Sequence, residues 1–146
     1  DSLLRIRTNP QILIMGDFND TPENTSITQI LAAEKITTRT EANKLYNLFA
    51  DPHVLNHPGT HKYQGEWNQL DHIIVSGNLL DKNSTMHVAP GSNRIFIPPF
   101  LLTEDKTWHG KRPFRTYYGF KYEGGYSDHL PIITDFLLSL PDKDLN

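Results

Sequence analysis

The 146-residue chain contains no cysteine, which excludes disulfides and thiolate metal sites. It also has no apolar run of the length that a membrane-spanning helix needs. The net charge is only −3, which argues against a protein that holds nucleic acid mainly by neutralising phosphates. Hydrophobic residues make up 37% of the chain, enough for the core of one small domain or of half a larger one.

Acidic, amide and imidazole side chains stand at one end of three apolar, strand-like runs. Gly-Asp-Phe-Asn at 16–19 follows such a run, Leu-Asp-His at 70–72 precedes one, and Ser-Asp-His at 127–129 precedes Leu-Pro and another. Each motif alone is more typical of a turn, a strand end or a helix cap. Together, two carboxylates, an amide and a histidine at strand ends indicate a general base with its orienting carboxylate and a divalent-metal site.

The N-terminal third predicts a strand and a helix. Residues 12–15 predict a buried strand, and in extended backbone Asp17 and Asn19 would face the same side while Phe18 turns into the core. Thr21-Pro22-Glu23 is typical of a helix start, and the helix is expected to fade around Lys35.

A second short helix is expected over 42–49. Residues 60–67 and 69–76 predict consecutive strands joined by a tight connection, and further strands are expected at 85–89 and 132–138. The predicted fold class is therefore α/β (α+β), with a mixed and mostly antiparallel sheet flanked by one or two helices.

The stretch 90–126 is rich in proline, glycine, aromatic and basic residues and predicts a long loop insertion. Arg112 and Arg115 could fork onto the phosphate of a ligand, which would make this loop a wall of the substrate site. The other interpretation is a loop whose tyrosines and tryptophan only pack over the sheet.

Gly-Asp-Phe-Asn with Pro22, Trp67 with Leu-Asp-His-Ile at 70–73, and Ser-Asp-His-Leu-Pro-Ile at 127–132 occur in that order. This set resembles the C-terminal half of the endonuclease/exonuclease/phosphatase superfamily, metal-dependent phosphoesterases related to pancreatic deoxyribonuclease. The last motif is the most specific and Leu-Asp-His-Ile the least. The resemblance implies half of a four-layer α/β sandwich over 1–140, followed by a polar tail at 141–146.

The candidate general base is His129, because an imidazole with an ordinary pKa of about 6.5 suits proton transfer near neutrality. The resemblance assigns Asp71 as the carboxylate that orients it, and Asp128 as a ligand of Mg²⁺, with Mn²⁺ as the alternative. In extended backbone Asp128 would point away from His129.

The resemblance gives Asp17 and Asn19 contacts to the phosphate, the nucleophilic water or a second metal. Trp67, Arg112 and Arg115 complete the prediction as substrate-binding residues.

Family members begin with another sheet that carries an asparagine, a metal-binding glutamate, and a tyrosine or histidine, and none of these has a place here. The chain starts in an apparent helix and is interpreted as a fragment whose partner is the N-terminal half of the same domain. We expect such a fragment to be nearly inactive alone, to bind magnesium poorly and to expose an apolar sheet face.

Other histidines are given structural interpretations. His72 follows Asp71 on the opposite strand face and is predicted to be structural. His53, His57 and His61 recur every four residues, but zinc ligands at that spacing need a helix, and the prolines at 52 and 58 interrupt one.

The leading hypothesis is a magnesium-dependent hydrolase of phosphate esters, with nucleic acid, lipid head groups, inositol phosphates and small esters as open substrate classes. The alternative is a non-catalytic binding domain that retains the fold. A binding domain has no chemical need to retain Asp71, Asp128 and His129 together.

Overall fold

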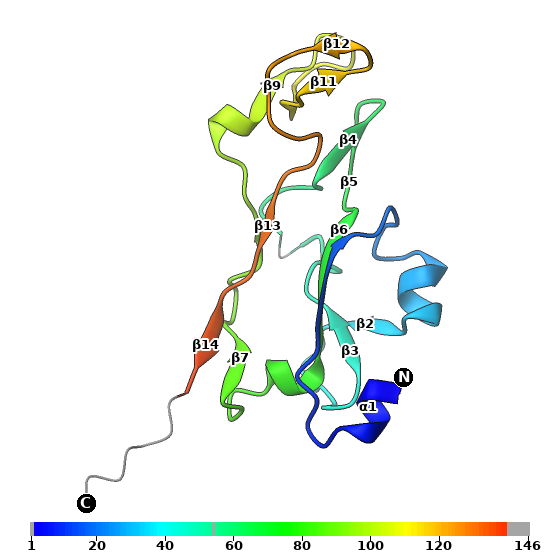
Figure 1. Ribbon diagram of the computed structural model, residues 1–146, viewed down its shortest axis with the longest axis vertical. Helices are drawn as coiled ribbons and strands as arrows, with labels where there is room; N and C mark the ends of the chain where they lie inside the picture. Colours follow the sequence, from blue (N-terminus) through cyan, green and yellow to red (C-terminus); the bar gives the residue numbers. More distant parts are fainter. Residues whose placement is uncertain (1, 54, 140–146) are drawn as a thin grey trace, which may run out of the picture.

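The computed structural model describes residues 2–53 and 55–139 (Figure 1). The predicted polar tail at 141–146 lies outside these residues. Within the described ranges, no helix is both long and apolar enough to cross a membrane.

A four-stranded sheet forms the centre of the molecule, in the order β1-β6-β3-β2. Its strands are β1 (Leu13–Asp17), β6 (Asp71–Ser76), β3 (Leu45–Asn47) and β2 (Ala33–Lys35). Both β1 and β3 pair antiparallel with β6, and β2 pairs parallel with β3. The apolar run of β6 is buried from its second residue onward, as expected for a strand with neighbours on both edges.

The two faces of this sheet pack against different segments (Figure 1). On one side lie α1 (Ser2–Ile6) and the π-helical turn η1 (Ser26–Ile30); on the other lie the 3₁₀ turn η2 (Gly77–Leu80) and a ribbon of β7 (Met86–Val88), β8 (Arg94–Ile95), β13 (Ile132–Ile133) and β14 (Phe136–Leu138). Ile74 belongs to the core between the sheet and the side of α1 and η1, which we call the first core. Ile73 and Val75 belong to the second core, on the side of the ribbon, because successive side chains of a strand point to opposite faces.

A group of small hairpins lies at one end of the molecule. We call residues 99–126 the hairpin lobe; it contains the 3₁₀ turn η3 (Pro99–Leu101) and strands β9 (Leu102–Glu104), β10 (Lys111–Pro113), β11 (Tyr117–Tyr118) and β12 (Lys121–Tyr122). The hairpin of β4 (His61–Tyr63) and β5 (Glu66–Asn68) reaches toward it. Lys62 joins the two through an ion pair with Asp105 at 2.9 Å, buried on both sides, and a 2.7 Å hydrogen bond to the carbonyl of His109.

The predicted class is confirmed, since strands dominate and nearly all pairings between them are antiparallel. The strands expected at 12–15 and 85–89 are present as β1 and β7. The helix predicted over 42–49 is wrong, because Leu45–Asn47 forms β3. All residues from 45 to 49 are buried, so pairing with β6 and β2 and burial on both faces outweigh the helical spacing of the apolar residues.

The helix predicted from Thr21 to about Lys35 is reduced to the single turn η1, and Ala33–Lys35 instead pairs as β2. A turn occupies the predicted helix start, where both the backbone N–H and the hydroxyl of Thr21 donate to the side-chain oxygen of Asn24. Local side-chain bonds of this kind compete with helix formation.

Three further predictions about strands are corrected. The strand expected over 60–67 is a hairpin, because Gln64 and Gly65 both adopt positive φ (48° and 91°) and reverse the chain. The strand expected over 132–138 is interrupted at Asp135, whose carbonyl accepts the backbone N–H of Ala89. The long loop expected over 90–126 contains several short paired strands.

The edge strand β1 leaves an apolar surface open, as the sequence predicts. Leu13 and Met15 are 45% and 71% exposed and project from the same face of β1. Their register partners Val75 and Ile73 on β6 are buried in the second core. That core therefore covers β6 but stops short of the sheet edge.

Replacing Ile74 by alanine should lower the free energy of unfolding by about 2–5 kcal/mol, because this fully buried side chain fills the core at the centre of the sheet. Met15→Ala is the matched control on the neighbouring strand and should cost less than about 0.5 kcal/mol. Urea denaturation of both variants measures the difference. An equal loss of unfolding free energy in both variants would show that Ile74 contributes no more to the core than Met15 does.

Candidate active site

The register between β1 and β6 brings two carboxylates together, because Asp17 ends β1 directly opposite Asp71, which begins β6. Gly16 precedes Asp17 with φ of +150°, a backbone conformation that residues with a side chain rarely adopt. This requirement explains the glycine of the Gly-Asp-Phe-Asn motif.

Asn19 does not continue the strand, contrary to the extended backbone expected for it. Its φ is +53°, and its backbone N–H donates to Oδ1 of Asp17 at 2.8 Å. Such side-chain-to-backbone bonds are typical of Asp at turns, and Asn tolerates the left-handed conformation. Phe18 still packs into the core, as predicted. Asn19 lies next to the site through this turn, with its side chain exposed.

His129 donates from Nδ1 to Oδ2 of Asp71 at 2.7 Å, which is the hydrogen bond expected between them. The acceptor is a carboxylate oxygen, so the bond fixes the tautomer and leaves the lone pair on Nε2. The hydroxyl of Thr60 donates to the same Oδ2. Thr60 is fully buried and its carbonyl accepts the backbone N–H of Leu130 at 2.8 Å, so one residue fixes both members of the pair.

A close backbone approach supports this arrangement. The backbone N–H of Thr60 donates to the carbonyl of Asn68 at 3.0 Å. A Cβ added at the preceding Gly59 would lie 2.5 Å from the Asn68 carbonyl, so this position requires glycine.

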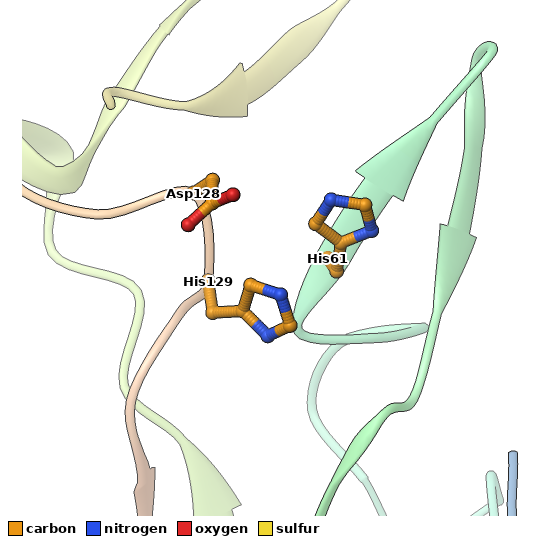
Figure 2. Close-up of side chains that lie close together, drawn as sticks. All are labelled: His61, Asp128 and His129. Atoms are coloured by element: carbon orange, nitrogen blue, oxygen red, sulfur yellow. The ribbon is translucent and has the colours of Figure 1, made fainter. Parts of the chain in front are cut away.

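His61 and Asp128 complete the cluster around His129 (Figure 2). The rings of His61 and His129 lie 4.6 Å apart with 32° between their planes, and their backbones form an isolated bridge. The ligand atoms of His61, Asp128 and His129 lie within 4.8 Å of one another, as do those of Asp17, Asp71 and His129. His129 is therefore shared by both groups.

The expectation that Asp128 points away from His129 is wrong. The hydroxyl of Ser127 accepts the backbone N–H of His129 at 3.1 Å, and this turn bends the chain so that both side chains enter the same cluster. Alternation of adjacent side chains applies only to extended backbone.

The pKa values of the two imidazoles are shifted in opposite directions. The hydrogen bond with Asp71 raises the pKa of His129 above its usual value, and the charges of Asp17 and Asp128 add to the effect. Burial lowers the pKa of His61, and the charges of His129 and Arg115 lower it further. Burial acts to raise the pKa of Asp71, but its hydrogen bonds with His129 and Thr60 lower it more strongly.

His72 is structural, as its place in the strand predicts. It is fully buried on the other face of β6, where Asn47 donates to its Nδ1 at 3.2 Å and its Nε2 bonds the carbonyl of Asp20 at 2.9 Å. Burial lowers the pKa of His72. Both ring nitrogens are occupied by protein partners, so this histidine is not available to a substrate.

Of the predicted substrate-binding residues, Trp67 lies in different surroundings from Arg112 and Arg115, both of which stack over the ring of Tyr118. Trp67 packs edge-on against His57 at 4.3 Å and lines a separate pocket of about 180 Å³. Arg112 pairs with Glu123 at 2.7 Å inside the hairpin lobe. Arg115 stacks over the ring of Tyr118 at 5.4 Å, and no carboxylate pairs with it in the described part of the chain.

Two residues of the cluster were missed by sequence reasoning. Thr60 offered no signal beyond its place at the start of an expected strand. His61 was considered only with His53 and His57, and these three do not come together: Nδ1 of His57 bonds the carbonyl of Gly59 at 2.7 Å. The strand pairing that places His61 beside His129 is long-range, so neither residue's role could be seen in local sequence.

The profile of the endonuclease/exonuclease/phosphatase family matches residues 1–137 of the chain. No curated protein and no solved structure gives a significant match. The matched range contains all three motifs and the cluster that they form with Thr60 and His61.

The opposite shifts of the two imidazoles can be measured. In histidine NMR titrations, His129 should titrate above about 6.5 and His61 below it. Asp71→Asn should lower the pKa of His129, because the hydrogen bond to a carboxylate is the largest cause of its shift. A His129 pKa unchanged in this variant would show that the Asp71 hydrogen bond does not set it.

Proposed function

Because the chain belongs to the endonuclease/exonuclease/phosphatase family, we propose that it contributes the general base and two metal-facing carboxylates to a hydrolase of phosphate esters. The hydrogen bond between Asp71 and His129 carries this proposal. It leaves Nε2 of a partly buried imidazole free and holds the ring in one tautomer, which is the arrangement that a general base needs.

In the proposed reaction, Nε2 of His129 takes a proton from a water molecule as the water oxygen attacks phosphorus. Asp71 stabilises the imidazolium that forms, since its carboxylate already accepts the Nδ1 proton. The bond between phosphorus and the leaving oxygen then breaks, the leaving oxygen takes up a proton from solvent, and the His129 imidazolium returns its proton to solvent. Thr60 keeps the Asp71 carboxylate in position throughout, because its hydroxyl bonds the same oxygen.

The donor set fits a magnesium ion. Asp17 and Asp128 are exposed carboxylates that each share a donor group with His129, so both lie beside the same imidazole. Mg²⁺ is commonly bound through one or two carboxylates, with waters and substrate phosphate filling the remaining positions. Asp128 and Asp17 would hold the ion, with the amide of Asn19 beside them, and Mn²⁺ accepts the same oxygen ligands. When bound, the ion would neutralise charge on the phosphoryl oxygens.

The metal-binding glutamate that the family resemblance implies has no counterpart among the residues assigned to this site, so we also propose that this chain alone is nearly inactive and that catalysis needs the full-length protein. The substrate is proposed at the level of a phosphate ester. A panel of DNA, RNA, lipid and inositol phosphoesters, tested with and without magnesium, would define its class. If no ester is cleaved but one binds, the domain is a binding module that retains the fold.

In the full-length protein, His129→Ala should lower kcat by at least about a hundredfold, because general-base catalysis is typically worth that much. KM should change little, since the base acts mainly in the transition state. The measurement is steady-state kinetics on one substrate from the panel.

His53→Ala is the matched control for His129→Ala, because His53 is an exposed histidine outside the cluster, and its kcat should equal that of the unaltered protein. Activity of the unaltered protein should fall as the pH drops through the raised pKa of His129, since the base must be unprotonated. A His129→Ala protein with near-normal kcat would remove the proposed base.

Arg115→Ala should raise KM several-fold with little change in kcat. This guanidinium has no acidic partner among the described residues, and its positive charge helps to lower the pKa of His61. Arg112→Ala is the comparison: it breaks the ion pair with Glu123 and should lower stability more than substrate affinity. Kinetics and thermal unfolding of both variants separate the two effects. An unchanged KM in Arg115→Ala would reduce this arginine to packing against Tyr118.

A further inference from the structure

His61, Asp128 and His129 form a second donor group that the proposed reaction does not use as a unit. Their ligand atoms lie within 4.8 Å of one another, and the three side chains come from two segments far apart in the sequence (Figure 2). His61 stands on β4, whereas Asp128 and His129 stand on the turn that leads to Leu130. Two imidazoles and one carboxylate therefore converge beside an open surface.

None of the three donor atoms needed for a metal is committed elsewhere in the described chain. His129 uses only Nδ1 for Asp71, and Figure 2 shows its other ring nitrogen facing the side of His61. Neither ring nitrogen of His61 and neither carboxylate oxygen of Asp128 has a hydrogen-bond or ion-pair partner among residues 2–53 and 55–139. Each is also at least partly accessible to solvent.

The hydrogen bond between Nδ1 of His129 and Asp71 would also support metal binding by His129. A histidine that binds a metal usually donates its other ring N–H to a carboxylate or carbonyl, which orients the ring and makes the ligand nitrogen more basic. Asp71 supplies that carboxylate, and Thr60 holds it in place. The support that suits His129 to be a base also suits it to be a metal ligand.

The position of His61 is fixed by its backbone bridge to His129 and by further contacts of its own hairpin. Its neighbour Lys62 is anchored to the hairpin lobe by the buried ion pair with Asp105, and β4 pairs with β5. Donor atoms around a tetrahedral zinc ion lie roughly 3.4 Å apart, from zinc–nitrogen bonds of about 2.0–2.1 Å. Metal binding would therefore draw the three donor atoms, which lie within 4.8 Å of one another, closer together.

We propose that His61, Asp128 and His129 bind a divalent transition-metal ion, Zn²⁺ in particular, at a site that shares Asp128 with the magnesium site but differs from it in donor chemistry. Two imidazoles with one carboxylate are a donor set typical of zinc and related ions with open coordination positions, whereas Mg²⁺ prefers oxygen ligands only. Zinc on Nε2 of His129 occupies the lone pair that would accept the proton of water. Zinc therefore inhibits hydrolysis, and this last step alone rests on the proposed function.

The binding test uses untagged protein with excess Mg²⁺ and titrates Co²⁺ by visible absorption, followed by displacement with Zn²⁺. We expect one ion per chain. His61→Ala should weaken binding at least about tenfold, and Asp71→Asn by about 10–100-fold through loss of the bond that orients His129. His53→Ala is the control with an exposed histidine elsewhere and should bind as the unaltered protein does.

A rescue variant separates ligation from packing. His61→Cys offers a thiolate, which zinc and cobalt accept, so it should restore binding that His61→Ala loses. The chain has no other cysteine, so a thiolate-to-cobalt charge-transfer band would report this bond alone. Circular dichroism checks that each variant is folded. Unchanged affinity in His61→Ala, or no 1:1 binding in the unaltered protein, would overturn the site.

The activity arm uses the full-length protein with Mg²⁺ and a cleaved substrate. Zinc should inhibit the unaltered protein and His53→Ala alike, and His61→Ala should need at least about tenfold more zinc for half inhibition. Zinc that binds at the site without inhibiting would support the site and overturn its inhibitory role. If no ester is cleaved, the proposed function fails, while the cobalt and zinc titrations still decide whether the site exists.

Discussion

The register of β1 on β6 is the constraint on which the rest of the site depends. It sets Asp17 opposite Asp71 at the end of the ladder and, at the same time, divides Ile73, Ile74 and Val75 between the two cores. A slip of one residue would turn every side chain of a strand to the other face. The burial of β6 on both faces therefore enforces the position of the Asp71 carboxylate, even though Asp71 itself contributes nothing apolar.

The cluster places three carboxylates around one imidazole, and this excess of negative charge shapes its chemistry. The pKa of His129 is raised by Asp71 first and by Asp17 and Asp128 after it. Asp71 is partly buried and hydrogen-bonded twice, whereas Asp17 and Asp128 remain exposed. Exposure keeps the desolvation cost of the outer carboxylates low and leaves their oxygens open to a cation.

Lys62 connects the hairpin lobe to the active-site strands through a buried ion pair. Lys62 lies between His61 and Tyr63 on β4 and is held by Asp105 and the carbonyl of His109. Removing one partner of a buried ion pair is costly, because the other charge stays uncompensated. The position of His61 thus depends on a loop that is remote in sequence, and Arg115 reaches the same region from that loop.

The sequence by itself determined the strands β1, β6 and β7 and the mostly antiparallel architecture, and its resemblance to the family implied the pairing of Asp71 with His129. These rest on short motifs at the ends of apolar runs, where local pattern and burial agree. Tertiary structure decided the rest. Residues 42–49 have helical spacing but form β3, because two neighbouring strands offer pairing that an isolated segment does not have. Asn19 and Asp128 turn where extended backbone was expected, because side-chain bonds to the backbone bend the chain. Thr60 and His61 enter the site only through contacts with Asp71 and His129, and such long-range contacts leave no trace in the local pattern of residues.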